Sequence, residues 1–289
     1  MLPPLHRILS LPVNRLILCL LTLAILSGCV SMATDRLAAN LSSAMLNQSD
    51  PDIVRHGAPA YLLLLDSLIE EDPHDQALLY AGAKLYNAYS GGLVTNPERQ
   101  KNLTQKALDY AGRGLCQTTP NICEKTSEPF DQFKQAIDKS GDKDLQGFYL
   151  YATSWASWIQ ARSDDWNAIA DLAKAQAMLE HIVAIDPGYE RGRAQLYLGV
   201  ITSQTPPALG GKPEIGRRHF EQALNYSAGD DLIVKLEFAR HYARLVFDKT
   251  LHDRLLNEII EADPVKPGLT LSNIIAQRQA GQLLEEDYF

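Results

Sequence analysis

Residues 178–187 read MLEHIVAIDP. The apolar residues of this stretch recur at the three- and four-residue spacing that places side chains on one face of an α-helix. Pro187 cannot continue such a helix, because it lacks a backbone N–H and clashes with the preceding turn. Proline also pushes the residue before it, Asp186, out of the helical conformation. The stretch therefore predicts an amphipathic helix that ends at Asp186.

The same pattern occurs at two other places in the chain. Residues 62–73 read LLLLDSLIEEDP, and residues 255–264 read LLNEIIEADP. A fourth helical stripe ends at Ser227-Ala228-Gly229, and the 36 residues from Ala228 to Pro264 approach the length of a tetratricopeptide repeat. No stretch after the N-terminal segment alternates with the period of two that is typical of strands. We predict an all-α fold of tetratricopeptide-like helical hairpins, stacked into one compact α-superhelical domain.

A longer internal duplication covers two modules, residues 61–115 and 175–229. Each contains an Asp-Pro pair, then Leu-Tyr, Gly-Gly and Pro-Glu, and the two sets are offset by about 114 residues. Segment 116–174 links the modules and includes an expected helix from Gln146 to Arg162, and helices in 230–289 follow. Because each module is too small to bury both of its faces, we expect the two to pack into one domain, residues 29–289.

Glycine pairs occupy matching places in the two modules. We expect them to form loop bends, because glycine accepts positive φ in a tight turn. Proline fits the first turn of a helix, where its missing N–H costs nothing. The predicted bend residues are Gly91, Gly92, Gly210, Gly211 and Pro213.

Composition sets broad limits on function. Hydrophobic residues make up 46% of the chain and charged residues 21%, which is an ordinary globular balance. The formal net charge is −8. This charge argues against a general nucleic-acid-binding protein, which needs a basic surface to neutralise phosphates.

The N-terminus has the pattern of a targeting signal. Residues 16–26 form an apolar run that is too short to cross a bilayer and follows two arginines. Leu26-Ser27-Gly28-Cys29 then resembles a bacterial lipobox, which implies removal of residues 1–28 and attachment of palmitate and further acyl chains at Cys29. Val30 stands where aspartate would resemble an inner-membrane retention signal, so the outer membrane is favoured. The alternative is an ordinary signal peptide with an incidental cysteine.

Two cysteines remain outside the signal and the lipobox, Cys116 and Cys123. An exported protein meets an oxidising compartment, and Pro120-Asn121 provides a turn between the two thiols. We predict a disulfide between them. The alternatives are two buried free thiols and, less favoured, a zinc site, which lacks an accompanying histidine or second cysteine pair.

The sequence contains no persuasive catalytic pattern. It has no His-Glu-x-x-His motif, no Gly-x-Ser-x-Gly elbow and no Walker loop. We interpret the histidines as solvated or core residues. The sequence therefore predicts no enzyme activity, no metal and no cofactor.

Aromatic residues gather in the linking segment. Phe148, Tyr151, Trp155 and Trp158 follow helical spacing, and all three tryptophans lie between residues 155 and 166. One interpretation is that this stripe fills the core beside a central helix. The other is that part of it lines a cavity for an apolar ligand. The candidate cavity residues are Tyr86, Tyr89, Tyr149, Tyr151, Trp155, Trp158, Trp166 and Tyr197.

Several of these stretches resemble one family, the T-component lipoproteins of TRAP transporters (TatT-like). The resemblance is carried by LYATSWASW at 150–158, DWNAIAD at 165–171, PALGGKPE at 207–214, HFEQAL at 219–224 and LSNIIAQ at 271–277. Together with the lipobox it covers essentially the whole chain after the signal. The pair Cys116 and Cys123 departs from the family pattern.

The resemblance implies a non-enzymatic, all-helical periplasmic lipoprotein that binds a TRAP solute-binding protein. It also implies a homotrimer with a pore through each subunit and the transfer of a hydrophobic ligand. The alternative is a general tetratricopeptide-like envelope scaffold that mediates protein–protein interactions and holds no ligand. An apolar cavity would favour the transport accessory, and a continuous polar groove would favour the scaffold.

Overall fold

The computed structural model describes residues 40–204, 208 and 211–289. Residues 46–289 form one compact unit, which is distinct from residues 1–45. The predictions for the signal segment, Cys29 and Gly210 lie outside the described residues. The account below concerns the unit from residue 46 onward.

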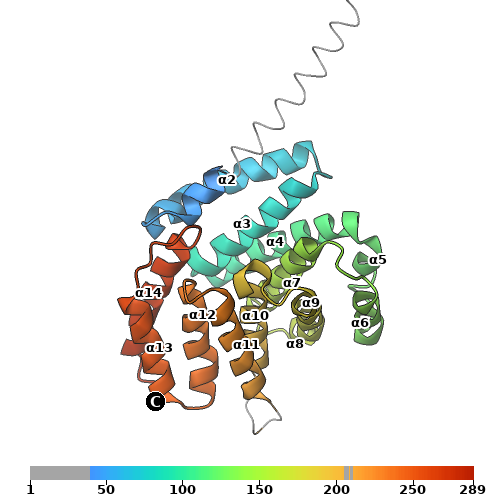
Figure 1. Cartoon of the computed structure of the whole chain (residues 1–289). Helices are drawn as coiled ribbons and strands as arrows, with labels where there is room; N and C mark the ends of the chain where they lie inside the picture. Colours follow the sequence, from blue (N-terminus) through green and yellow to red (C-terminus); the bar gives the residue numbers. More distant parts are fainter. Residues whose placement is uncertain (1–39, 205–207, 209–210) are drawn as a thin grey trace, which may run out of the picture. The chain divides into compact units, whose positions relative to one another are not determined.

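All regular structure in the described residues is helical, with no strand among them (Figure 1). This confirms the predicted all-α class. The elements are α2 (Pro51–Glu71), α3 (Gln76–Leu93), α4 (Pro97–Thr118), α5 (Pro120–Cys123), α6 (Phe130–Asp138), α7 (Leu145–Gln160), α8 (Trp166–Ala170), α9 (Leu172–Ile185), α10 (Tyr189–Thr202), α11 (Pro213–Tyr226), α12 (Leu232–Glu237), the π-helical segment η2 (Phe238–Ala243), α13 (Lys249–Glu261) and α14 (Thr270–Glu285).

Aspartate-proline pairs end three helices, as predicted. Helix α2 ends at Glu71, α9 at Ile185 and α13 at Glu261, each within three residues of its proline. Polar side chains cap several helix starts: those of Asp75 and Asp248, for example, accept hydrogen bonds from backbone N–H groups in the first turn of α3 and α13. A cap of this kind contributes about 1 kcal/mol. Local signals thus set several of the helix ends.

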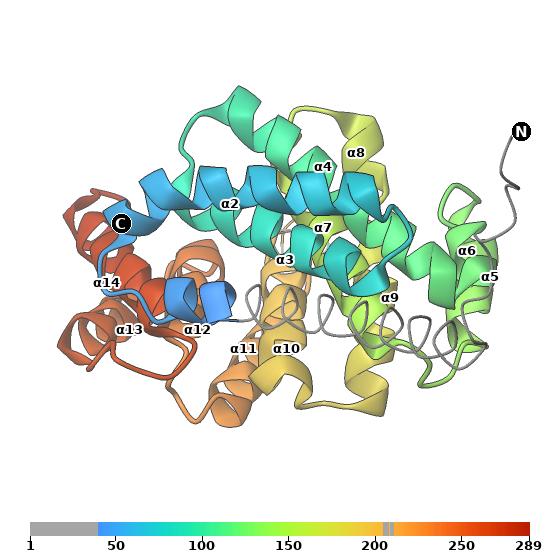
Figure 2. The same cartoon turned by 90° about the horizontal axis from the view of Figure 1, so that it is seen from above.

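Successive helices pack on one another through the unit. Helix α2 packs on α3, α3 on α4, α4 on α7 and α7 on α9, and the series continues through α10 to α11. Figure 2 shows α2 running across α3 and α4, with α12–α14 at one end of the series and α5–α6 at the other. Helix α14 also touches α2. The tetratricopeptide-like superhelix and the internal duplication stay predictions.

Two clusters of buried side chains form much of the core. One joins α4, α6, α7, α9 and α10, and includes Phe133, Phe148 and Met178. The other joins α10–α14, and there the rings of Phe220 and Phe238 stack with their centroids 4.9 Å apart. The boundary between the two lies along α10, which contributes residues to both clusters.

The predicted glycine bends are only partly right. Gly91 and Gly92 lie inside the last turn of α3, so the prediction that they form a loop bend is wrong. A helix end tolerates glycine, and a Cβ at Gly92 would be 3.4 Å from the side chain of Ile275 on α14, so the position serves close packing. Gly211 does lie in the connection before α11, which begins at Pro213.

Candidate functional site

The tryptophans of the aromatic segment do not share one cavity. Trp155 is 4% exposed and packs against Phe133 and Tyr151, with ring centroids 6.1 Å and 5.2 Å away. Trp155 is therefore a core residue, which was the alternative interpretation of the stripe. Trp166, in contrast, is 83% exposed at the first position of α8. The prediction that Trp166 lines a cavity is wrong, because its helix starts at the capping residue Asp165 and directs it outward.

Trp158 lies between these extremes. Its indole Nε1 donates a hydrogen bond to Gln105 Oε1 at 2.6 Å, and the guanidinium of Arg162 lies 4.5 Å from its ring centre. A hydrogen-bonded indole N–H and a cation over the ring are typical of a tryptophan that connects two helices. Trp158 thus holds α7 against α4.

Tyr86 and Tyr89 belong to a separate network among α2, α3 and α4. The Tyr86 hydroxyl donates to Asp66 Oδ2 at 2.8 Å, and the Tyr89 hydroxyl donates to the carbonyl of Arg55 at 3.0 Å. Asp66 also accepts hydrogen bonds from Tyr110 and Lys106. Burial and the Asp66 carboxylate raise the pKa of Tyr86 above its ordinary range. These tyrosines are buried structural donors, and the prediction that they line the cavity with Trp155 is wrong.

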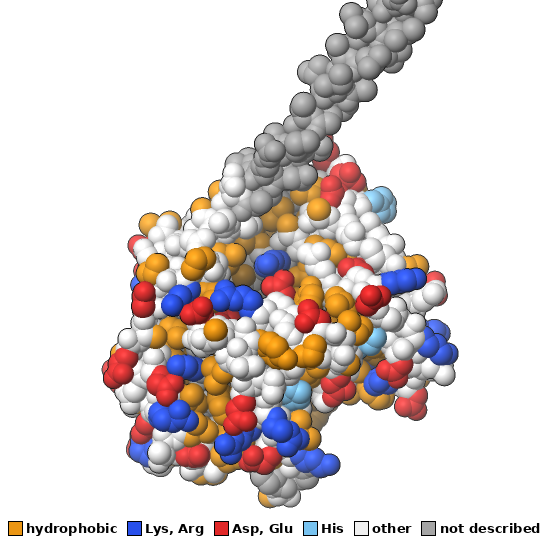
Figure 3. Space-filling view, viewed as in Figure 1, with side chains coloured by type: hydrophobic (Ala, Val, Ile, Leu, Met, Phe, Trp, Pro, Cys, Tyr) orange, Lys and Arg blue, Asp and Glu red, His pale blue; other side chains and the backbone are white. Residues whose placement is uncertain are grey.

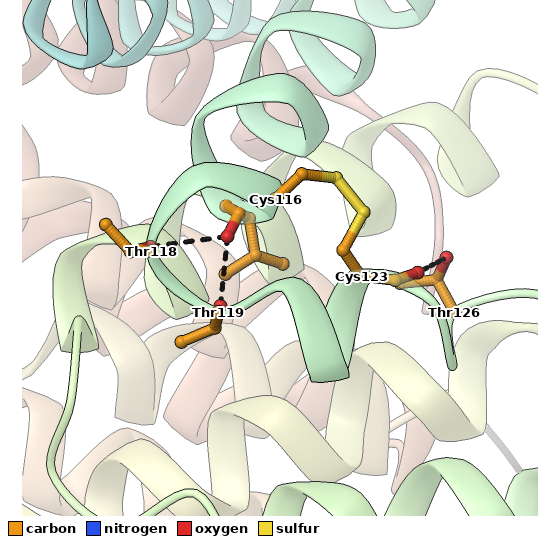
Figure 4. The surroundings of a disulfide bond; sticks show 6 residues. Cys116, Thr118, Thr119, Cys123 and Thr126 are labelled. Carbon is orange, nitrogen blue, oxygen red and sulfur yellow. Dashed lines mark hydrogen bonds between the residues drawn. A yellow bond between two sulfur atoms is a disulfide. The ribbon is translucent and has the colours of Figure 1, made fainter.

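Tyr151 faces a surface pocket beside the disulfide. Cys116 and Cys123 are joined, with their Cα atoms 5.0 Å apart, and link the end of α4 to α5 (Figure 4). Hydroxyls of Thr118 and Thr119 donate to the Leu115 carbonyl around this link. The pocket is about 290 Å³ and is lined by Leu108, Asp109, Gly112, Arg113, Leu115, Cys123, Thr126 and Tyr151. A second pocket, of about 310 Å³, lies between α3 and α7.

Tyr149 on α7 and Tyr197 on α10 do come together. Their ring centroids are 6.4 Å apart, and the ring of Tyr189 lies 5.4 Å from that of Tyr149. Tyr149 and Tyr197 both keep accessible surface, yet burial is the main cause that raises the pKa of each above its ordinary value. Both side chains are therefore partly accessible and largely surrounded by protein. We call this group the tyrosine cluster and define it by Tyr149, Tyr189, Tyr197 and Arg193.

Arg193 brings a charge to the tyrosine cluster. It lies one helical turn before Tyr197, and its Nε donates to Asp231 Oδ2 at 2.8 Å. The Arg193 side chain is 35% accessible, whereas that of Asp231 is 2% accessible. Burial alone would lower the pKa of Arg193, but Asp231, Tyr149 and Tyr197 together raise it above its ordinary value. The guanidinium is therefore held as a cation. The other carboxylate oxygen, Asp231 Oδ1, is buried without a hydrogen-bond partner in the part of the chain that the structure describes.

An unusual backbone turn places Arg193. Glu190, Arg191 and Gly192 adopt positive φ values of 49°, 58° and 84°, the left-handed region that non-glycine residues rarely occupy. Such conformations persist when surrounding structure holds them, and they gather at functional positions. The sequence analysis identified neither this turn nor the Arg193–Asp231 pair. The four-residue spacing of Arg193 and Tyr197 was an available signal, because it puts both on one face of a helix.

Charges on the outer surface are mixed. In Figure 3, acidic and basic side chains alternate over the described part of this face, with hydrophobic side chains between them. Among the described residues, no group of three or more His, Cys, Asp or Glu side chains is arranged to hold a metal ion. None of the described helices combines the length and the hydropathy needed to cross a membrane.

Comparison with known proteins places this geometry in one family. A family model described as TRAP transporter T-component matches residues 47–289, which include every helix from α2 to α14 and the tyrosine cluster. None of the curated proteins matches the chain.

Proposed function

The chain belongs to the TRAP transporter T-component family, and from this premise we propose that it is a non-enzymatic lipoprotein accessory of a TRAP transport system. In this proposal it binds the solute-binding protein of that system and carries a hydrophobic ligand. The single observation that carries the ligand part is the tyrosine cluster, where partly accessible aromatic rings lie together. Sites that combine apolar surface with a few polar groups are typical ligand sites.

The tyrosine cluster offers apolar surface to a ligand. Tyr149 and Tyr197 offer ring faces, and tyrosine keeps a hydroxyl that can orient what it touches. Burial of apolar ligand surface contributes about 25 cal/mol per Å², so even a short alkyl chain gains several kcal/mol before entropic costs. The surrounding core, with Phe148 and Met178 fully buried, gives the rings a rigid support.

Exposed apolar side chains support a protein partner. Trp166 is 83% exposed on α8, and Leu63 is 69% exposed on α2. Tryptophan is enriched among the residues that dominate binding energy at protein interfaces. We propose that the region around Trp166 contacts the solute-binding protein. The homotrimer that the resemblance implies is part of the same proposal.

The location follows from the N-terminal signal. We propose acylation at Cys29 and a place on the periplasmic side of the envelope, with the outer membrane favoured by Val30. Two or three acyl chains give firm attachment, because each buried methylene contributes about 0.8 kcal/mol. Twenty-one residues separate Cys29 from the start of α2.

A pull-down from periplasmic extract tests the proposal. The purified chain is the bait, and bound proteins and small molecules are both identified by mass spectrometry. We expect a TRAP solute-binding protein and an apolar small molecule. Recovery of several envelope-assembly proteins without either would favour the alternative, a general tetratricopeptide-like scaffold.

A pair of variants locates the contact surface. Trp166→Ala should reduce recovery of the solute-binding protein. Phe247→Ala is the matched control, because Phe247 is 74% exposed but lies between η2 and α13, in a different part of the fold. Equal recovery by Trp166→Ala and the unaltered chain would show that the contact lies elsewhere.

A further inference from the structure

Gly112 occupies a position at which a helix normally avoids glycine. It lies inside α4 and is partly buried, and glycine in a helix interior is less favourable than alanine. A Cβ at Gly112 would lie only 3.3 Å from Cε2 of Tyr151 on α7. Gly112 and Tyr151 both line the pocket of about 290 Å³ beside the disulfide. The missing side chain therefore keeps this pocket open above the ring of Tyr151.

The inner surface of the pocket is mostly apolar. Leu108 and Leu115 of α4 and the ring of Tyr151 form it, and Cys123 closes one side. The disulfide holds Cys123 against the end of α4 (Figure 4). Ligand pockets commonly measure about 300–1,000 Å³, so a pocket of about 290 Å³ suits a small molecule with a short apolar body.

Two opposite charges stand at the rim of the pocket. Asp109 and Arg113 both line it and are both exposed. An acidic residue followed four residues later by a basic one is a favourable ion-pair arrangement on a helix. Here the two side chains are drawn apart. Asp109 Oδ1 accepts a hydrogen bond from Gln105 Nε2 at 2.9 Å, one turn earlier in α4. Arg113 Nη2 donates to the carbonyl of Pro73, after α2, at 2.8 Å.

Both charged groups keep hydrogen-bonding capacity. In the described part of the chain, the carboxylate of Asp109 has one hydrogen bond, at Oδ1, and the guanidinium of Arg113 uses one of its five N–H donors. A simple anion at this place would meet the negative charge of Asp109, and a simple cation would meet the positive charge of Arg113. A ligand that carries both charges meets a partner for each.

We propose that this pocket binds a zwitterionic amino acid with a small apolar side chain. Its ammonium group contacts Asp109, its carboxylate contacts Arg113, and its side chain lies in the pocket against Leu108 and Tyr151. A free α-amino acid carries both charges on one carbon, which suits two side chains that are one helical turn apart. The inference goes beyond the proposed function and does not rest on it, because this site on α4 shares no residue with the tyrosine cluster.

Calorimetric titration with three related probes tests the class of ligand. The full lipoprotein is placed in nanodiscs, and the heats from empty nanodiscs are subtracted. The probes are L-leucine, N-acetyl-L-leucine, which lacks the ammonium group, and L-leucinamide, which lacks the carboxylate. We expect L-leucine to bind ~5-fold more tightly than either analogue, because an ion pair at an accessible position makes a modest contribution.

Two variants assign each charge to its partner. Asp109→Asn should weaken L-leucine binding ~5-fold and leave N-acetyl-L-leucine binding unchanged, because that probe has no ammonium group to lose. Arg113→Gln should weaken L-leucine binding by a similar factor and leave L-leucinamide binding unchanged. Lys134→Gln and Asp138→Asn are the matched controls, since these residues form an exposed pair with the same four-residue spacing on α6. Both controls should bind L-leucine as the unaltered chain does.

Each outcome decides the inference. Absence of L-leucine binding, or equal binding of all three probes by the unaltered chain, would overturn it. Equal weakening of all three probes in Asp109→Asn or in Arg113→Gln would also overturn it, because the residue would then shape the pocket without contacting a charge. The same loss in the α6 controls would show a general effect of surface charge. Loss of L-leucine binding confined to the predicted combinations supports the inference, and recovery of a solute-binding protein is measured separately.

Discussion

Trp155 and Trp166 carry the same side chain in one aromatic segment, but their surroundings are opposite. Trp155 is 4% exposed among Phe133, Tyr151 and Ile159, and Trp166 is 83% exposed. Removing a large buried side chain costs its transfer free energy and leaves a cavity, whereas removing an exposed one does neither. The residue type alone therefore does not set its contribution to stability.

Substitution by alanine measures this difference. Trp155→Ala should lower the free energy of unfolding by about 3–5 kcal/mol. Trp166→Ala should change it by less than about 0.5 kcal/mol. Urea unfolding followed by circular dichroism gives both values. Similar losses in the two variants would contradict the assignment of Trp155 to the core and of Trp166 to the surface.

His219 should make stability depend on pH. Its Nδ1 lies 2.6 Å from Gln195 Oε1, and burial lowers its pKa below the ordinary value. The unfolded chain therefore binds a proton at His219 near pH 6.5, whereas the folded chain binds it only at a lower pH. This contribution to stability is complete above about pH 6.5 and is lost as the pH falls. Urea unfolding at pH 7.5 and 5.5 should show a smaller pH effect in His219→Gln than in the unaltered chain. His74→Gln, at an exposed position, should keep the full effect.

At the scale of the element, the start of α10 is held in an unusual conformation. Three consecutive residues with positive φ precede Arg193, and only one of them is glycine. A Cβ at Gly192 would lie 2.9 Å from Cβ of Tyr226 and 3.1 Å from Cα of Ala223 on α11. Both the backbone conformation and the contact with α11 therefore require glycine here.

Gly192→Ala should lower the free energy of unfolding by about 1–3 kcal/mol, because it adds strain and a clash with a backbone atom. Gly91→Ala is the control. Gly91 lies inside α3 with nothing within 4 Å of an added Cβ, so alanine should stabilise the protein by about 0.5–1 kcal/mol. Equal effects of the two substitutions in chemical denaturation would show that the left-handed turn is not a constraint.

The link between α4 and α5 gives a second prediction for an element. Because the disulfide closes a loop of only a few residues, replacing both cysteines by serine should cost about 2–3 kcal/mol of stability on the chain-entropy account. The unfolded, unreduced protein should gain no mass on thiol alkylation. A mass increase for two alkylated thiols would instead favour the pair of free cysteines.

At the scale of the whole molecule, features set by local signals could be predicted from the sequence, whereas features set by long-range packing could not. The helix ends at Asp72 and Asp186 were predictable, because proline and capping act within a few residues. The meeting of Tyr149 with Tyr197 was not, because spacing along one helix does not say which helix covers each face. The same limit explains Trp166: its closeness in sequence to the aromatic stripe suggested a shared cavity, but a new helix starts at that residue. The ion pair between Arg193 and the buried Asp231 depends entirely on a contact between residues distant in sequence.

The attachment of the protein to the membrane can be tested in the cell. The lipobox predicts acyl chains on Cys29, and the combined burial of two or three chains makes dissociation slow compared with a single chain. Metabolic labelling with a palmitate analogue should mark the unaltered chain and leave Cys29→Ala unmarked, with the variant in the soluble periplasmic fraction. Val30→Asp should keep the label but move the protein from the outer to the inner membrane fraction on a density gradient. Equal labelling of Cys29→Ala would show that the N-terminal segment is an ordinary signal and that another feature must hold the protein at the envelope.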